Sequence, residues 1–206
     1  MPRAVRRPAS PRPSPVAGID TDRIAAAVAE ILAAIGEDPT RPGLVDTPRR
    51  VALAHAEYFS GLSRDPLEHL ADTLPVDSAT GDLVLLRDIE VRSMCEHHLL
   101  PFTGVAHIAY VPGEKIIGLG RLPLVVDTLA SRPQLQERLT EEIADAVQAG
   151  LDPRGVLVVV DAVHQCVSAR GVRQTRSSTV TMAARGTLAD PVGRAEIIMM
   201  IGAPRD

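Results

Sequence analysis

Each of the two cysteines in this chain has a histidine close by in the sequence. Residues 95–98 read Cys-Glu-His-His, and residues 164–166 read His-Gln-Cys. Thiolate and imidazole groups are ligands that zinc prefers, and three protein ligands with one open position are typical of a catalytic zinc site. We therefore interpret Cys95, His98 and Cys166 as candidate ligands of one zinc ion, provided that the chain turns between Cys95 and His98.

Two further histidines, His97 and His164, stand beside these candidate ligands. An imidazole titrates near neutral pH, which suits it to proton transfer. Zinc lowers the pKa of its bound water and makes hydroxide available at neutral pH. Together these groups predict hydrolytic attack on an electrophilic carbon. A zinc nucleobase deaminase fits the same description, but its H-x-E and P-C-x-x-C signature is absent from the sequence.

A simpler interpretation stays open for the same residues. Cys95 and Cys166 can be small buried hydrophobic side chains, with surface histidines as their neighbours. Three of the six histidines lie beside the only two cysteines, which favours a metal site. We interpret the remaining histidines as structural, because they fall on expected helices or strands; they are His55, His69 and His107.

A second polar stretch begins the helix expected after residue 134. There Gln136 and Glu137 offer an amide and a carboxylate to a ligand. A carboxylate suits the neighbouring N–H donors of guanine. An ordinary helix start with a charged outer face explains these two residues equally simply, and from the residues alone it is the preferred interpretation.

Composition limits the classes of function that the chain can have. Its 206 residues suit one domain with a small appendage. Aromatic residues make up 2%, too few for the stacking platforms that bind single-stranded nucleic acid. The net charge is −4, and an acidic body argues against duplex binding. The sequence lacks both a long apolar run and the apolar core of a signal peptide. We expect a cytoplasmic protein without a nucleic-acid or membrane partner.

The pattern along the chain divides it into three parts. Residues 1–18 are expected to be a disordered, basic, proline-rich tail, residues 19–75 an N-terminal helical region, and residues 76–206 the catalytic domain. Helical periodicity and alternating apolar residues predict the order helices, two strands, two helices, two strands and a last helix, which is an α+β pattern. The expected elements are helices at 20–35 and 47–60, strands at 83–94 and 104–111, helices within 121–149, strands at 155–164 and within 167–186, and a helix at 190–201.

Several segments together resemble the GTP cyclohydrolase I family, in order and in spacing, over about residues 20–201. The segments are Cys-Glu-His-His-Leu-Leu-Pro-Phe at 95–102, Gln-Leu-Gln-Glu-Arg-Leu-Thr at 134–140, His-Gln-Cys at 164–166, Arg-Gly-Val at 170–172 and Ser-Ser-Thr-Val-Thr at 177–181. The resemblance implies a tunnelling fold with antiparallel strands, helices on one side and a ββααββ core, assembled into a homodecamer.

The resemblance also implies a reaction and roles for individual residues. Zinc held by Cys95, His98 and Cys166 activates water that attacks C8 of GTP. The imidazole ring opens, formate leaves, and a rearrangement gives 7,8-dihydroneopterin triphosphate for tetrahydrofolate or other pterins. By position, the other residues match as follows: His97 and His164 are the acid/base histidines, Gln136 and Glu137 the guanine-recognition pair, Arg121 and Arg170 phosphate-binding residues, and Arg50 a residue that reaches a neighbouring subunit's site.

The departures from the family pattern gather around the expected phosphate site. Gly120 replaces a serine, Arg121 a lysine, Leu124 an arginine that contacts phosphate, and Gln174 a lysine. A lost charge-assisted contact is worth about 1.5–3 kcal/mol. Two alternatives therefore remain beside the ordinary enzyme. One is a paralogue that opens the ring of a purine nucleotide or nucleoside with a different phosphate tail. The other is a ligand-binding or regulatory member of the fold.

Overall fold

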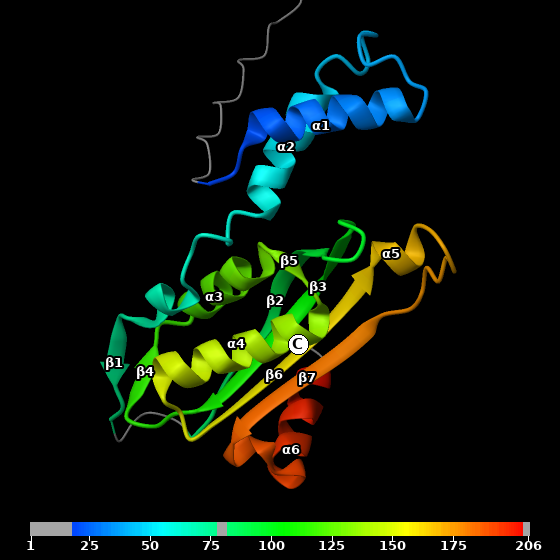
Figure 1. The fold of residues 1–206 in the computed structure, drawn as a ribbon. Helices are drawn as coiled ribbons and strands as arrows, with labels where there is room; N and C mark the ends of the chain where they lie inside the picture. Colours follow the sequence, from blue (N-terminus) through cyan, green and yellow to red (C-terminus); the bar gives the residue numbers. More distant parts are fainter. Residues whose placement is uncertain (1–17, 78–81, 204–206) are drawn as a thin grey trace, which may run out of the picture. The chain divides into compact units, whose positions relative to one another are not determined.

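The computed structural model describes residues 18–77 and 82–203 (Figure 1), and these form two compact units. One unit ends at Glu57, and the other begins at Tyr58. The disordered tail expected over residues 1–18 lies outside the described residues except for Gly18.

Two helices make up the N-terminal unit, as the periodicity predicts. Helix α1 is Thr21–Ala34, and the side chain of Asp20 caps it by accepting a hydrogen bond from the Arg23 N–H at 2.9 Å. Helix α2 is Thr47–Tyr58 and has a proline at its second position. An oxygen acceptor before the first turn and a proline within it are favoured because the first N–H groups of a helix have no partner within the helix.

The second unit is built on a five-stranded sheet with the strand order β5-β2-β3-β6-β7. Its long antiparallel strands are β2 (Val84–Cys95), β3 (Pro101–Val111), β6 (Gly155–His164) and β7 (Thr179–Gly186). Strand β5 (Pro133–Gln134) adds a short parallel pair at the edge of β2. The sequence pattern does not predict β5, because two residues carry no periodicity.

Smaller elements lie at the end of the unit opposite β5. Strands β1 (Thr73–Pro75) and β4 (Lys115–Ile117) form a separate antiparallel pair, which the sequence pattern also missed. A short 3-10 helix, η1 (Pro66–Leu70), precedes them and is capped by Asp65. Strand β3 ends at Val111, shortly before β4 begins at Lys115.

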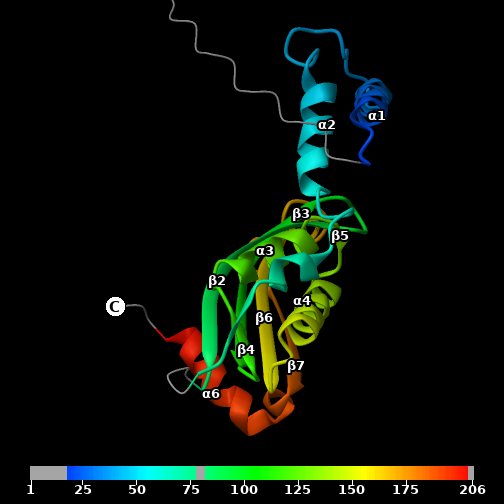
Figure 2. The same cartoon turned by 90° about the vertical axis from the view of Figure 1, so that its left-hand side faces the viewer.

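Two helices cover one face of the sheet, α3 (Arg121–Ala130) and α4 (Gln136–Leu151), as Figure 1 and Figure 2 show. Apolar residues recur along their buried sides, and α3 packs on β2 while α4 packs on β6 and β7. The order β2-β3-α3-α4-β6-β7 confirms the ββααββ core of the expected tunnelling fold. The fully buried centre of this layer contains Phe102, Ile108, Leu122, Leu139, Ile143 and Val158.

A last helix lies on the opposite face. Helix α6 (Pro191–Gly202) follows the 3-10 helix η2 (Thr187–Ala189), and Ile197 of α6 packs against Leu157 and Val159 of β6. The sheet is therefore partly covered on its second face too. None of the described helices is long and apolar enough to cross a membrane.

Candidate active site

A tight turn joins the end of β2 to the start of β3. The Cys95 N–H donates to the carbonyl of Leu100, and the Leu99 N–H donates to the carbonyl of Cys95, both at 2.9 Å. Leu99 has a φ of 49°, a left-handed conformation that a branched side chain rarely adopts. This turn brings His98 back beside Cys95, as a Cys-x-x-His ligand pair requires.

The third candidate ligand arrives from the neighbouring strand. In the β3–β6 register, His164 lies opposite Phe102. The short helix α5 (Gln165–Ser168) follows at once and carries Cys166 toward the turn. The Sγ atoms of Cys95 and Cys166 and a ring nitrogen of His98 all lie within 4.8 Å of one another. This Cys-His-Cys group can hold a metal ion.

The two sulfurs of this group lie close enough to affect each other's ionisation. Burial raises the pKa of the Cys166 thiol, and the neighbouring Cys95 sulfur raises it further. Two adjacent thiolates repel each other, and a metal ion removes that cost because it binds the deprotonated form. Cys95 is buried, Cys166 is partly buried and His98 is exposed, so the group lies at the surface end of the core. The donor set of two sulfurs and one imidazole fits a soft or borderline divalent ion.

His164 is held by two contacts beside the Cys-His-Cys group. Its ring stacks on Phe102 with centroids 4.6 Å apart, and its Nε2 lies 2.7 Å from Oε1 of Gln136. Burial lowers the pKa of His164, and the nearby Glu137 opposes that shift. The neutral imidazole is therefore favoured, and the position of its single proton matters.

Gln136 is almost completely buried, and its contacts fix the orientation of its amide. Its Nε2 donates to the carbonyls of Val160 at 3.0 Å and Thr179 at 2.8 Å, with Thr181 Oγ1 at 3.1 Å. The nitrogen must face these carbonyls, so the oxygen faces His164. His164 then donates from Nε2, and its Nδ1 is the acceptor nitrogen of the neutral ring.

A hollow of about 220 Å³ joins these groups. His97 and His164 both line it together with Glu137, whose side chain is exposed, and with Cys95 and Cys166. Gln136 also lines the hollow, but its amide hydrogens are directed to protein carbonyls. The carboxylate of Glu137 is thus the better placed of the expected pair to meet a ligand. The hollow is smaller than the 300–1,000 Å³ usual for complete ligand pockets.

The candidate phosphate residues are placed differently from one another. Arg170 lies near the Cys-His-Cys group, with Nη1 3.4 Å from His98 Nε2. Arg121 lines a separate open hollow of about 340 Å³ and pairs with Asp72 at 3.5 Å. Arg50 belongs to α2 of the N-terminal unit, where it pairs with Asp46 at 3.3 Å.

The positions that depart from the family pattern also have local roles. Gly120 and Leu124 line the same hollow as Arg121, and Leu124 is 42% exposed. Gln174 donates to the carbonyl of Val172 at 3.1 Å.

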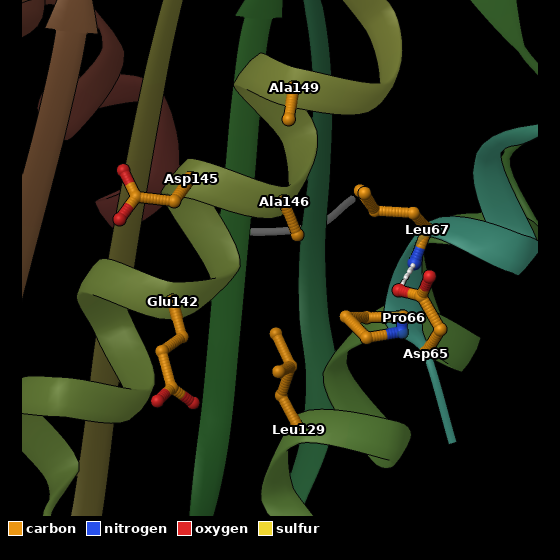
Figure 3. Close-up of a pocket in the computed structure, with 8 residues that line it drawn as sticks. All are labelled: Asp65, Pro66, Leu67, Leu129, Glu142, Asp145, Ala146 and Ala149. Atoms are coloured by element: carbon orange, nitrogen blue, oxygen red, sulfur yellow. Dashed lines mark hydrogen bonds between the residues drawn. The ribbon is translucent and has the colours of Figure 1, made fainter.

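A third hollow, between η1, α3 and α4, carries no comparable chemistry (Figure 3). Its floor includes Leu129 and Ala146, and its lining contains neither histidine nor cysteine. The carboxylate of Glu142 accepts from Gln134, and that of Asp145 accepts from Arg185. These acids therefore belong to the packing of α4.

Residues that the sequence analysis did not single out also shape the site. Phe102 stacks on His164, Gln134 lines the hollow, and Arg138 bonds Glu96 in the turn. Each stood within a family-like segment, but no spacing rule marks it. These contacts arise only from the register of β2, β3, β5 and β6.

An α+β fold of the tunnelling type with a Cys-His-Cys group where its strands end defines the class of this protein. The family model for GTP cyclohydrolase I matches residues 24–202. A protein of Leifsonia xyli subsp. xyli called GTP cyclohydrolase 1 is 62% identical over 185 residues, which cover 90% of this chain and 97% of that protein. A protein of the same name from Carboxydothermus hydrogenoformans is 53% identical, covering 89% and 96%.

Among solved structures, an archaeosine synthase QueF-Like in the apo form is similar with a TM-score of 0.42 and 20% identity, over 52% of this chain and 96% of that one. The sequence matches span nearly the whole of both chains. This chain belongs to the GTP cyclohydrolase I family.

Proposed function

We propose that this enzyme opens the imidazole ring of GTP by hydrolysis at C8. One water is consumed overall, C8 leaves as formate, and the remaining atoms rearrange to 7,8-dihydroneopterin triphosphate. The observation that carries the proposal is the shared hollow in which His97, His164 and Glu137 meet the Cys-His-Cys group. The near-full-length similarity to proteins called GTP cyclohydrolase 1 supports the same conclusion.

Zinc is the metal proposed for this group, held by Cys95, His98 and Cys166. The support is the donor set, since two thiolates and one imidazole leave one position of a tetrahedral zinc ion open. When bound, zinc supplies a Lewis acid that makes water nucleophilic at neutral pH. Zinc binds cysteine as the deprotonated thiolate, and its positive charge stabilises that form.

The chain's own residues orient the base and move protons. The Glu137 carboxylate accepts hydrogen bonds from two adjacent N–H donors of guanine, which turns C8 toward the Cys-His-Cys group. His164 exchanges protons at Nδ1, because Nε2 is committed to Gln136. His97, which also lines the hollow, serves as the second acid/base group. Gln136 acts by holding His164, and its side chain has no N–H directed at the base.

The triphosphate extends beyond the hollow toward arginine side chains. Arg170 meets it next to the Cys-His-Cys group. Arg121 and Arg50 are proposed to serve the site of a neighbouring subunit in a homodecamer.

Exposed apolar residues on β7 and α6 support association between subunits, including Val180 at 60%, Val192 at 80% and Met199 at 70% exposed. We place the reaction in the cytoplasm, with the product supplied to tetrahydrofolate or other pterins.

A paralogue that acts on a shorter phosphate tail is the second candidate. The exposed Leu124, at a position where the family usually has arginine, favours it. Zinc-loaded protein offered GTP, GMP and guanosine separates the two by kcat/KM for formate release. A strong preference for GTP supports the ordinary enzyme, whereas preference for GMP or guanosine supports the paralogue. Absence of formate from all three would overturn both.

A further inference from the structure

One arginine of α4 reaches the turn that carries two of the candidate metal ligands. We call residues 95–100 the ligand turn. Arg138 donates from Nη2 to the carboxylate of Glu96 at 2.5 Å and to the carbonyl of Pro133 at 3.1 Å. Its Nε donates to Oε1 of Gln134 at 3.0 Å. A single guanidinium therefore links the ligand turn to β5.

Glu96 is the residue through which this link acts on the ligands. It stands between Cys95 and His98, and its own N–H donates to the carbonyl of Gln134 at 3.0 Å. Backbone and side chain of Glu96 are thus both tied to the β5 segment. The turn beyond it is exposed at His98 and Leu99 and contains the strained φ of 49° at Leu99. Such a turn depends on specific bonds because few buried contacts hold it.

Two side chains, Gln134 and Glu142, fix the position of the Arg138 guanidinium. Gln134 is 1% exposed, and its Nε2 donates to the carbonyl of Leu129 at 3.0 Å and to Glu142 at 2.8 Å. The Glu142 carboxylate also lies 3.8 Å from Nε of Arg138. A planar guanidinium with several fixed acceptors is pre-organised in a way that an isolated surface ion pair is not.

We propose that Arg138 is a positioning residue that, through Glu96, holds Cys95 and His98 at the spacing that a metal ion needs. The inference rests on the metal site of the proposed function and extends it to residues that touch neither metal nor substrate. Without the bond, the turn must lose conformational freedom each time a metal binds. Partners that orient ligands typically change metal affinity by about 10- to 100-fold.

The test measures how fast zinc-loaded protein releases its metal to a chromogenic chelator. The variants are Arg138→Gln, Glu96→Gln and the double variant. Arg185→Gln is the matched control, because Arg185 of β7 also forms charged contacts with residues of α4, Glu141 and Asp145, but makes no bond to the ligand turn. The melting temperature of each chelator-treated protein reports any general loss of stability.

We expect Arg138→Gln and Glu96→Gln to release zinc about tenfold or more faster than wild type, with the double variant close to the faster single one. Arg185→Gln should stay within about twofold, and all variants should melt near the wild type because none of the replaced side chains belongs to the hydrophobic core. Arg138→Lys should rescue only part of the loss. Zinc release from both single variants at the Arg185→Gln rate would overturn the inference. A wild type that retains no zinc would overturn the proposed metal site as well, so the two failures are distinguishable.

Discussion

The side-chain oxygen of Gln136 lies 2.7 Å from Nε2 of His164, and the nitrogen of the same amide is bonded to the carbonyls of Val160 and Thr179. This arrangement assigns the His164 proton to Nε2 and leaves Nδ1 to exchange protons. A buried amide that cannot rotate thus decides which ring nitrogen takes part in the chemistry.

Replacing Gln136 with methionine should remove the acceptor that fixes the His164 proton at Nε2, while a side chain of similar volume still fills the buried space. We expect kcat to fall by about 10- to 100-fold with KM for GTP and zinc content much less affected, because the His164 ring loses its orienting acceptor. Thr181→Val is the control, since it removes the longest of the amide's donor contacts and the bond between the Thr181 and Thr140 hydroxyls, but leaves the Gln136–His164 bond in place. Nitrogen-15 spectra of the histidine rings should report mainly the Nε2–H form in wild type; an Nδ1–H form there would refute the assignment.

Loss of the acid/base residue His164 and loss of the metal ligand Cys166 should give different defects. His164→Ala should retain zinc and lose about 10²- to 10⁴-fold in turnover, because a proton-transfer group is gone while Cys95, His98 and Cys166 remain. Cys166→Ala should lose both zinc and turnover. Elemental analysis of each purified variant beside a formate assay checks both statements. Zinc loss from the His164 variant would show that ligand and acid/base roles have been exchanged.

Metal removal should expose the closeness of the two sulfurs. Once zinc is chelated, the Cys95 and Cys166 thiols lie within 4.8 Å and can form a disulfide, with dissolved oxygen as the two-electron oxidant. Intact mass spectrometry should then show a loss of two hydrogens, which a thiol reductant reverses. Cys166→Ser is the control and should keep its mass. Thiols that persist in the wild type after prolonged exposure to air would contradict this placement.

His107 should make folding stability depend on pH away from the site. Burial lowers its pKa, as does the positive charge of Arg87, whereas Asp161 opposes the shift. Its Nδ1 accepts a hydrogen bond from the Asp88 N–H at 3.2 Å, and the Asp88 carboxylate lies 3.9 Å away. The folded protein therefore favours the neutral His107 ring, whose Nδ1 is free of a proton and can accept this bond.

The sign of this effect follows from linkage. As pH falls below about 6.5, the unfolded chain binds a proton at His107 that the folded chain binds only at lower pH, so the free energy of unfolding decreases. Urea unfolding at pH 7.5 and 5.5 should show a smaller decrease for His107→Asn, whose Oδ1 can replace the Nδ1 acceptor. An equal decrease in both proteins would exclude His107 as a source.

Much of this arrangement could be predicted from the sequence, because long periodic segments carry their own evidence. The helices at α1, α2 and α4 and the strands β2, β3 and β6 fall where apolar spacing predicts them. Cys95, His98 and Cys166 form the expected group because a Cys-x-x-His pair needs only a turn, and the strand before Cys166 pairs beside it.

Other features could not be predicted because they depend on register. The amide of Gln136 donates to carbonyls of β6 and β7, and nothing in residues 134–140 signals which strands will surround it. The partnership of Arg138 with Glu96 joins residues 42 positions apart and arises only when β5 pairs with β2. Strands as short as β5 leave no pattern to detect.

Hydrolysis at C8 of GTP can be observed by following that carbon from substrate to product. Zinc-loaded protein is incubated with GTP labelled with carbon-13 at C8, and the products are followed by NMR. We predict that the label appears in formate in a one-to-one ratio with an unlabelled pterin triphosphate, and that both form about 10²- to 10⁴-fold more slowly with His164→Ala. Label that remains in the purine, or that appears in the pterin, would show that C8 does not leave as formate.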